Sequence, residues 1–234
     1  MKAFHNDEKI KKKYIERVKA HSLADEIIKG TYWENGKGCA VGCTIHDSDH
    51  KNYEIELGIP RILAKLEDQI FENLPNELAK EWPLEFLESI KVGADLSKVW
   101  HKFAIFLLID PTQCNSKHPQ CKIVADNLQN ELDGHKIDWL AIKNSAYTAA
   151  ATYATYATYA DAAADAAADA ADAAATYATY ATYAAVAYAA TAVADAADAA
   201  ATYATYAAAA AADTIQKSYI KQSKKLLELL KECE

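Results

Sequence analysis

The densest group of potentially reactive side chains lies in the segment GKGCAVGCTIHDSDH, residues 36–50. Four of its residues are of types that ligate zinc: Cys39, Cys43, His46 and His50. Their spacing, C-x3-C-x2-H-x3-H, differs from that of common zinc fingers, in which about a dozen residues separate the cysteine pair from the histidine pair. On one continuous helix the four side chains would span about 16 Å, too far for one tetrahedral ion. A single metal site therefore requires a bent loop, which Gly36, Gly38 and Gly42 permit.

The same glycine-rich stretch could bind a small anion. Gly36, Lys37 and Gly38 together resemble the closely approached backbone that cradles phosphate groups. Gly42 and His46 complete this candidate ligand site. The stretch is not a Walker motif, because no GxxxxGK[ST] pattern is present. A plain tight turn accounts for the same glycines.

A third interpretation is nucleophilic chemistry, in which a histidine such as His46 activates the thiol of Cys39 or Cys43. This would make the protein a small cysteine-dependent hydrolase, or a zinc-dependent one if the same residues held an ion. No flanking signature supports either enzyme. Buried structural thiols and surface histidines account for the same residues without any chemistry.

Other reactive side chains have ordinary structural explanations. A looser group of ligand types surrounds Pro119 and is interpreted as loop residues: Cys114, His118 and Cys121. The carboxylate pairs Glu67–Asp68 and Glu85–Glu88 fall on predicted helices, where a solvated helix surface explains them. All four tryptophans are expected in the core: Trp33, Trp82, Trp100 and Trp139.

The elements that must position these side chains are predicted to be helical. Apolar residues at helical spacing predict helices over the following ranges: 6–29, 60–74, 83–92, 95–110, 120–132 and 214–230. Asn6 is the expected N-cap of the first helix and Gly30 its stop. Pro60 and Pro83 are each expected in the first turn of a helix. The pattern favours an all-α fold.

Two shorter elements complete the expected N-terminal region. Asn35-Gly36 is a strong tight-turn signal and predicts a short hairpin or a structured loop. Asp47 or Ser48 could begin a short helix that ends at Gly58.

The residues that interrupt regular structure divide the chain into two regions. No Gly, Pro or Trp occurs after Trp139. We therefore expect a helical domain over residues 1–140 and a low-complexity Ala/Thr/Tyr/Asp region over 141–234, which ends in an amphipathic helix. Alanine is the best helix former, so the repeat is predicted to form one extended helix or an antiparallel helical hairpin. Such alanine-rich helices would act as a spacer, or their small side chains would form a surface through which chains associate into homo-oligomers.

The net charge of −8 lies almost wholly in the repeat. Residues 146–213 contain seven aspartates and no Lys or Arg, which leaves a charge of −1 for the rest of the chain. Binding of nucleic acid through this segment is disfavoured, because phosphates require cationic partners. The sequence has no apolar stretch of about 18 residues, so no membrane span is expected. The absence of an apolar run behind MKAFHNDEKIKKK, together with an odd cysteine count, favours a cytoplasmic protein with free thiols.

Three blocks of the sequence resemble an uncharacterised family of bacterial and phage-associated proteins. They are GKGCAVGCTIH (36–46), ELGIPRILAKLEDQIFENLP (56–75) and GADLSKVW (93–100). Members of that family carry an alanine-rich repetitive C-terminal segment of variable composition. The resemblance covers about residues 30–110 and implies no activity for any residue.

We expect a non-catalytic binding or interaction protein whose Gly/Cys/His loop engages a small anionic ligand or a metal, with zinc as the candidate ion. A protein partner is the other expected binding class. The alternatives are the cysteine- or zinc-dependent hydrolase and a purely structural protein that assembles through its alanine-rich helices.

Overall fold

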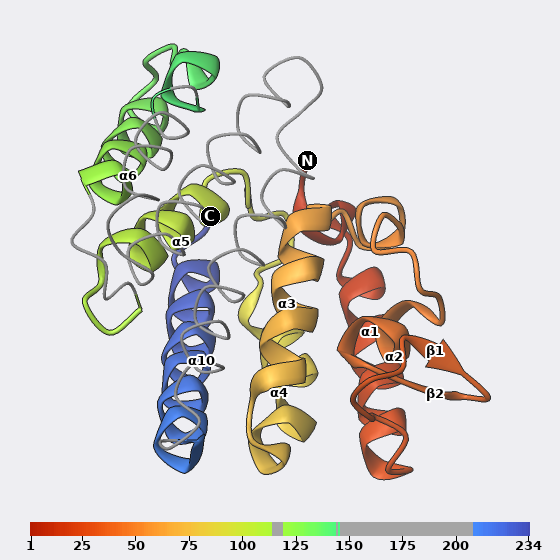
Figure 1. Cartoon of the computed structure of the whole chain (residues 1–234). Helices are drawn as coiled ribbons and strands as arrows, with labels where there is room; N and C mark the ends of the chain where they lie inside the picture. The colour runs from red at the N-terminus through yellow and green to blue at the C-terminus, as the bar shows by residue number, and fades with distance from the viewer. Residues whose placement is uncertain (114–118, 144, 146–207) are drawn as a thin grey trace. The chain divides into compact units, whose positions relative to one another are not determined.

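The computed structural model describes residues 1–113, 119–143, 145 and 208–234 (Figure 1). The expectations for Cys114, His118 and the repeat over 146–207 lie outside these described residues. The described residues are mostly helical, with a single two-stranded sheet among them, which confirms the all-α fold. None of the described helices combines the length and the apolar character needed to cross a lipid bilayer.

The chain forms two compact units. The first comprises Met1–Val99 and Tyr219–Glu234, and the second comprises Trp100–Ser218. These two units are defined by contacts between residues. The domain boundary expected near residue 140 is based on composition alone and stays a prediction. The end of the chain joins the first unit, where the amide of Asp95 donates to the carbonyl of Glu234 at 2.9 Å.

The first unit contains four whole α-helices, a hairpin, a short 3-10 helix and a short π-helix, and it ends with the C-terminal part of a further helix. In chain order its elements are η1 (Ala3–Asn6), α1 (Glu8–Leu23), β1 (Trp33–Glu34), β2 (Lys37–Gly38), α2 (Ala40–Ile45), η2 (Tyr53–Leu57), α3 (Arg61–Asn73) and α4 (Asn76–Ser89). The second unit holds most of α5 (Val99–Ile109), all of α6 (Pro119–Leu132) and the start of α10 (Ala208–Lys231). The helix predicted over 214–230 therefore forms the greater part of α10.

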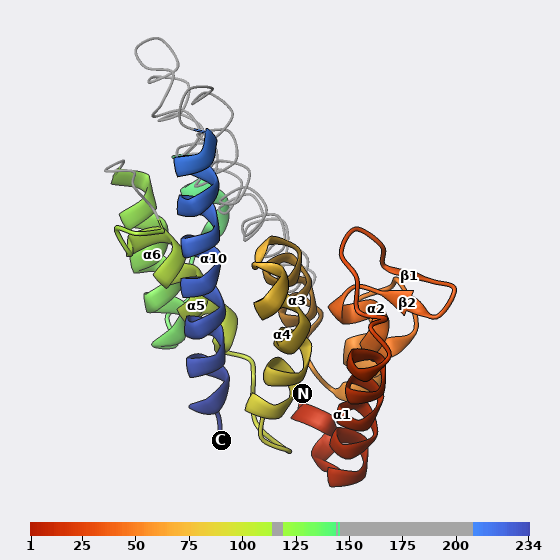
Figure 2. The same ribbon diagram turned by 90° about the horizontal axis from the view of Figure 1, so that it is seen from below.

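Helix α2 is the centre of the first unit. It contacts α1, α3 and α4, and all six of its residues are buried. Helix α3 lies beside α4, and the hairpin lies at the edge of the unit next to α2, in both views (Figures 1 and 2). The hydroxyl of Thr44 donates to the carbonyl of Ala40 at 2.9 Å, which satisfies a polar group in this buried helix.

The predicted hairpin is confirmed. Strands β1 and β2 pair antiparallel, with Trp33 opposite Gly38 and Glu34 opposite Lys37. Asn35 and Gly36 both take positive φ angles, of 51° and 82°. This is the geometry of a type I′ turn, which an Asn-Gly pair favours.

Two glycines let the segment before the hairpin lie directly against α2. A Cβ atom at Gly38 would lie 2.1 Å from the carbonyl oxygen of Tyr32, and one at Gly42 would lie 1.5 Å from the same oxygen. Any side chain at either position would displace this backbone. The segment Gly30–Trp33, here called the strap, therefore depends on Gly38 and Gly42 for its place on α2.

The predicted bounds of helices α1 and α4 are wrong. Helix α1 begins after Asp7, whose carboxylate accepts from the amide of Lys9 at 2.8 Å, and it ends at Leu23 because Asp25 takes a φ of 54°. Pro83 lies inside α4 and does not open a helix. The helix starts earlier, after Pro75, and the buried ring of Trp82 packs against Phe86 across the proline.

Burial also corrects three side-chain expectations. Trp33 is only half-buried, whereas the other three tryptophans lie in the core. Glu67 and Asp68 are buried and do not form a solvated helix surface. The reason is their position one turn after Leu63 and Ala64, on the face of α3 that packs inward.

Replacing Gly42 by Ala tests the close approach of the strap. Alanine in a helix is ordinarily more stable than glycine by about 1 kcal/mol. Here the added Cβ meets backbone, so we expect Gly42→Ala to lower the free energy of unfolding by about 3 kcal/mol, as overpacking does. Urea denaturation measures this difference. The control Gly134→Ala places its Cβ in open space at a φ of 89° and should cost about 1 kcal/mol; equal losses for both variants would contradict the argument.

Candidate functional site

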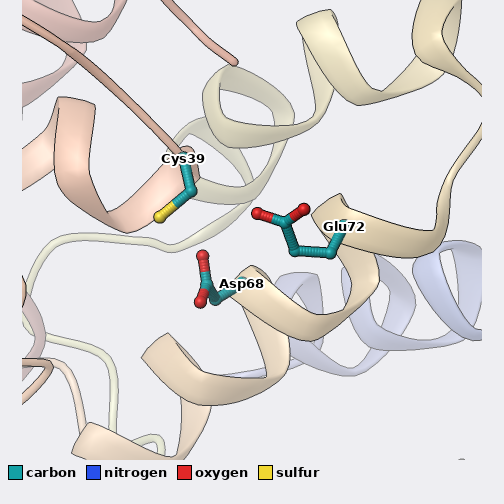
Figure 3. Close-up of side chains that lie close together, drawn as sticks. All are labelled: Cys39, Asp68 and Glu72. Atoms are coloured by element: carbon teal, nitrogen blue, oxygen red, sulfur yellow. The ribbon is translucent and has the colours of Figure 1, made fainter. Parts of the chain in front are cut away.

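Three potential metal ligands meet where α2 begins beside α3. The sulfur of Cys39 and one carboxylate oxygen each from Asp68 and Glu72 all lie within 4.8 Å of one another. Asp68 and Glu72 are four residues apart on α3 and so share one face of that helix. Figure 3 shows both carboxylates turned toward the sulfur of Cys39. We call these three residues the Cys39 cluster.

Backbone contacts hold Cys39 in place as the N-cap of α2. Its amide donates to the carbonyl of Thr31 at 2.7 Å, and its sulfur accepts from the amide of Gly42 at 3.5 Å. Only 1% of the residue is exposed. Burial raises the pKa of the Cys39 thiol, and the negative charge of the nearby Asp68 carboxylate raises that pKa further. The thiol therefore keeps its proton at neutral pH unless a cation compensates the charge.

Asp68 has one oxygen with a partner and one without. Its Oδ2 lies 3.3 Å from Nε2 of His50, whereas its Oδ1 is buried and has no hydrogen-bond partner. The residue is 8% exposed. A buried polar atom without a partner costs free energy, so it requires an explanation such as a bound ion.

Glu72 and Tyr32 complete the surroundings of the cluster. Both carboxylate oxygens of Glu72 accept from the amide of Gly30, at 3.1 and 3.0 Å. Burial raises the pKa of Glu72, and the negative charge of Asp68 adds to this rise. The pKa of Tyr32 is also raised, first by burial and then by the charges of Asp68, Cys39 and Glu72. The cluster thus gathers acidic groups that each disfavour the ionisation of another.

The structure separates the four residues of the predicted C-x3-C-x2-H-x3-H site. Of these, Cys39 belongs to the cluster, and His50 touches it through Asp68. Cys43 lies elsewhere: its thiol donates to the carbonyls of Gly38 and Glu26 at 3.3 and 3.6 Å, and burial raises its pKa to about 12. His46 stacks on the ring of Trp33, with ring centroids 4.4 Å apart. Within the described residues, the four side chains do not form one ligand group.

The residues of the predicted anion site form part of the hairpin or make room for the strap. Gly36 forms the turn and Lys37 is a residue of β2. The space beside Gly38 and Gly42 holds the carbonyl oxygen of Tyr32, which is a hydrogen-bond acceptor. These two glycines therefore accommodate the chain's own backbone at this face.

Asp68 and Glu72 are candidate ligands that the sequence patterns did not predict. The available signal was the register of α3, in which Asp68 follows the apolar residue Ala64 by one turn. A carboxylate on an apolar helix face requires a partner, so this position could have been marked. The identity of that partner depends on contacts between α3 and α2, which local patterns do not contain.

A second buried carboxylate lies next to the cluster on α3. Glu67 is 0% exposed, and its Oε2 accepts from the hydroxyl of Tyr53 at 2.6 Å, while its Oε1 has no partner. Burial raises the pKa of Glu67 well above its usual range, and the charge of Asp68 raises it further. The protonated form of Glu67 is therefore the one that the fold favours.

Comparison of the chain with protein-family models, with curated proteins and with solved structures finds no match. The resemblance to a bacterial and phage-associated family therefore stays a prediction.

Glu67→Gln tests the protonation of the buried carboxylate. Because the folded state raises the pKa of Glu67, the folded chain binds a proton that the unfolded chain releases above pH 4.5. The stability that this proton contributes is complete below pH 4.5 and falls as pH rises through the folded-state pKa, by up to about 1.4 kcal/mol per pH unit. Glutamine cannot ionise, so the variant should gain stability relative to the wild type as pH rises. Urea unfolding from pH 4 to 9 measures the difference.

The matched control is Glu85→Gln, which changes an exposed glutamate of α4. It should leave the pH profile of the wild type unchanged. A constant difference between Glu67→Gln and the wild type at every pH would show that Glu67 ionises normally in the folded chain.

Proposed function

We propose that the protein binds a divalent transition-metal ion, with zinc the best fit, through Cys39, Asp68 and Glu72. Two observations carry this proposal: the three residues each offer a ligand atom within 4.8 Å of the others, and Oδ1 of Asp68 is buried without a hydrogen-bond partner. An ion at their centre would give this oxygen the partner that it lacks.

The chemistry of the three ligands favours zinc. Zinc accepts thiolate sulfur at about 2.3 Å and carboxylate oxygen at about 2.0–2.2 Å, so small side-chain movements would close the group around an ion. Calcium and magnesium select oxygen ligands, and a thiolate does not suit them. Binding would release the proton of Cys39, which makes the affinity rise with pH.

His50 supports this arrangement from outside the ligand group. Its Nε2 is 3.3 Å from Oδ2 of Asp68, so a proton on that nitrogen would orient the carboxylate and leave Oδ1 for the ion. Carboxylates that ligate metals are commonly held by such hydrogen bonds. We assign His50 as a positioning residue.

The charge of the site argues against a small anion as its ligand. One thiolate and two carboxylates outweigh the two positive charges of zinc, so the loaded site carries a net charge of about −1. Three protein ligands leave one coordination position, which water or another neutral donor fits best. A metal is therefore the better of the two ligands expected from the sequence.

A cysteine nucleophile has less support. Reactive cysteines are partly exposed and have a lowered pKa. Cys39 and Cys43 are both buried, and burial raises the pKa of each. Both are free thiols, which supports a reducing compartment such as the cytoplasm. Self-association through the alanine-rich segment stays a separate proposal.

Cobalt substitution tests the proposed ligands. Addition of Co²⁺ to the metal-free chain should produce a near-ultraviolet thiolate-to-cobalt absorption band at one ion per chain. We expect Cys39→Ser to abolish the band and Asp68→Asn to weaken binding by more than about 100-fold, because each removes a direct ligand. His50→Gln removes only the positioning contact and should cost about 10-fold.

Cys43→Ser is the matched control, because it changes a buried thiol of the same helix that lies outside the cluster. It should keep both the band and the affinity. The proposal fails if well-folded Cys39→Ser protein, as judged by circular dichroism, binds Co²⁺ and Zn²⁺ as tightly as the wild type.

A further inference from the structure

Two histidines from distant parts of the chain meet outside the Cys39 cluster. His21 lies in the last turn of α1, and His46 is the residue that ends α2. Their Nε2 atoms are 2.7 Å apart. Nδ1 of His21 lies 2.6 Å from the carboxylate of Glu26, and the side chain of His21 is only 12% exposed. The residues thus form a chain from a carboxylate through one imidazole to the second.

The hydrogen bond to Glu26 determines which nitrogen of His21 can accept. Glu26 accepts the Nδ1 proton, so neutral His21 has its lone pair on Nε2. The 2.7 Å contact then requires that His46 donates its Nε2 proton to this lone pair. Partial desolvation of its ring, followed by the charges of Arg17 and His21, lowers the pKa of His46, which favours the neutral imidazole.

The ring of Trp33 fixes the orientation of His46. The two rings are stacked, with their planes 11° apart, and the ring of His21 meets both of them edge-on. His46 is exposed, so solvent reaches its ring. The carboxylate of Glu26 and the indole of Trp33 fix the positions of the two imidazoles.

We propose that His21 and His46 form a two-imidazole site for a divalent transition-metal ion of the nickel, copper and zinc group. An ion with metal–nitrogen bonds of about 2.0–2.1 Å needs the two nitrogens about 2.9 Å apart at a right angle and about 3.3 Å apart at a tetrahedral angle, so their separation of 2.7 Å would have to grow by roughly 0.2–0.6 Å. Imidazole suits these ions. On binding, the proton of His46 transfers by way of water from Nε2 to Nδ1, so both rings stay neutral and both Nε2 lone pairs face the ion.

Glu26 has the role that carboxylates commonly have behind metal-bound histidines. Such an outer partner fixes the tautomer and raises the basicity of the ligand, and its loss typically costs 10- to 100-fold in metal affinity. Glu26 is therefore a positioning residue for this site. The remaining coordination positions are open to water.

Titration of the full chain with Ni²⁺, followed by tryptophan fluorescence, tests the site. Ni²⁺ bound at His46 lies beside the indole of Trp33 and should quench its emission. We expect His46→Asn to weaken Ni²⁺ binding at least 10-fold, since asparagine tolerates the left-handed backbone of residue 46 and lacks an imidazole. Glu26→Gln should weaken binding 10- to 100-fold, because glutamine favours the wrong tautomer of His21.

Three controls make the result specific. His135→Ala removes an exposed histidine of the other unit and should leave the affinity unchanged. Trp33→Phe should remove the quenching while calorimetry still detects the ion. Cys39→Ser should not alter the Ni²⁺ titration, so failure here is distinguishable from failure of the Cys39 cluster. Wild-type affinity for Ni²⁺ in folded His46→Asn protein, or no Ni²⁺ binding by the wild type, would falsify the proposal.

Discussion

The close contact between the carbonyl oxygen of Tyr32 and the two glycines of the α2 region is the constraint on which the first unit depends. Gly38 and Gly42 leave room for this oxygen and for no side chain, so the strap lies directly against α2. That position brings the amide of Gly30 to Glu72, the carbonyl of Thr31 to Cys39 and the ring of Trp33 to His46. A segment of four residues therefore holds parts of both proposed sites, and the glycines of the GKGCAVGC motif are explained by backbone packing.

Helix α3 contains the energetically least favourable feature of the first unit, which is the burial of acidic side chains. It buries two adjacent carboxyl groups, Glu67 and Asp68, and each retains one oxygen without a partner. The loss of hydration is compensated differently for the two carboxyl groups. Glu67 takes a proton and a short hydrogen bond from Tyr53, whereas Asp68 faces Cys39 and Glu72, groups that are themselves acidic. Protonation removes the buried negative charge of Glu67, while a cation is the natural complement of the acidic group around Asp68.

Local rules predicted the fold class and several boundaries, because those features depend on neighbouring residues. The Asn35-Gly36 turn and the helix end at Gly58 required only backbone preferences. The prediction at Pro83 is wrong because the packing of Trp82 against Phe86 outweighs the preference of proline for a first turn. The ligand partners could not be found, since Cys39 meets α3 and His46 meets α1 through tertiary contacts. The four residues lie close together in the sequence and suggest one site, whereas the structure places Cys39 and His50 at the Cys39 cluster, His46 beside His21 and Cys43 at neither.

The contrast between Cys39 and Cys43 shows how partners decide the role of a side chain. Both thiols are buried in or next to α2, and burial raises the pKa of both. The thiol of Cys43 donates to the backbone carbonyls of Glu26 and Gly38, and among the described residues it belongs to no group of ligand side chains. Cys39 receives an amide hydrogen from Gly42 and faces two carboxylates. An amide donor stabilises a thiolate, and carboxylates beside it require a positive ion. Of two cysteines with the same burial, only Cys39 therefore has surroundings suited to a metal ligand, whereas those of Cys43 preserve the thiol.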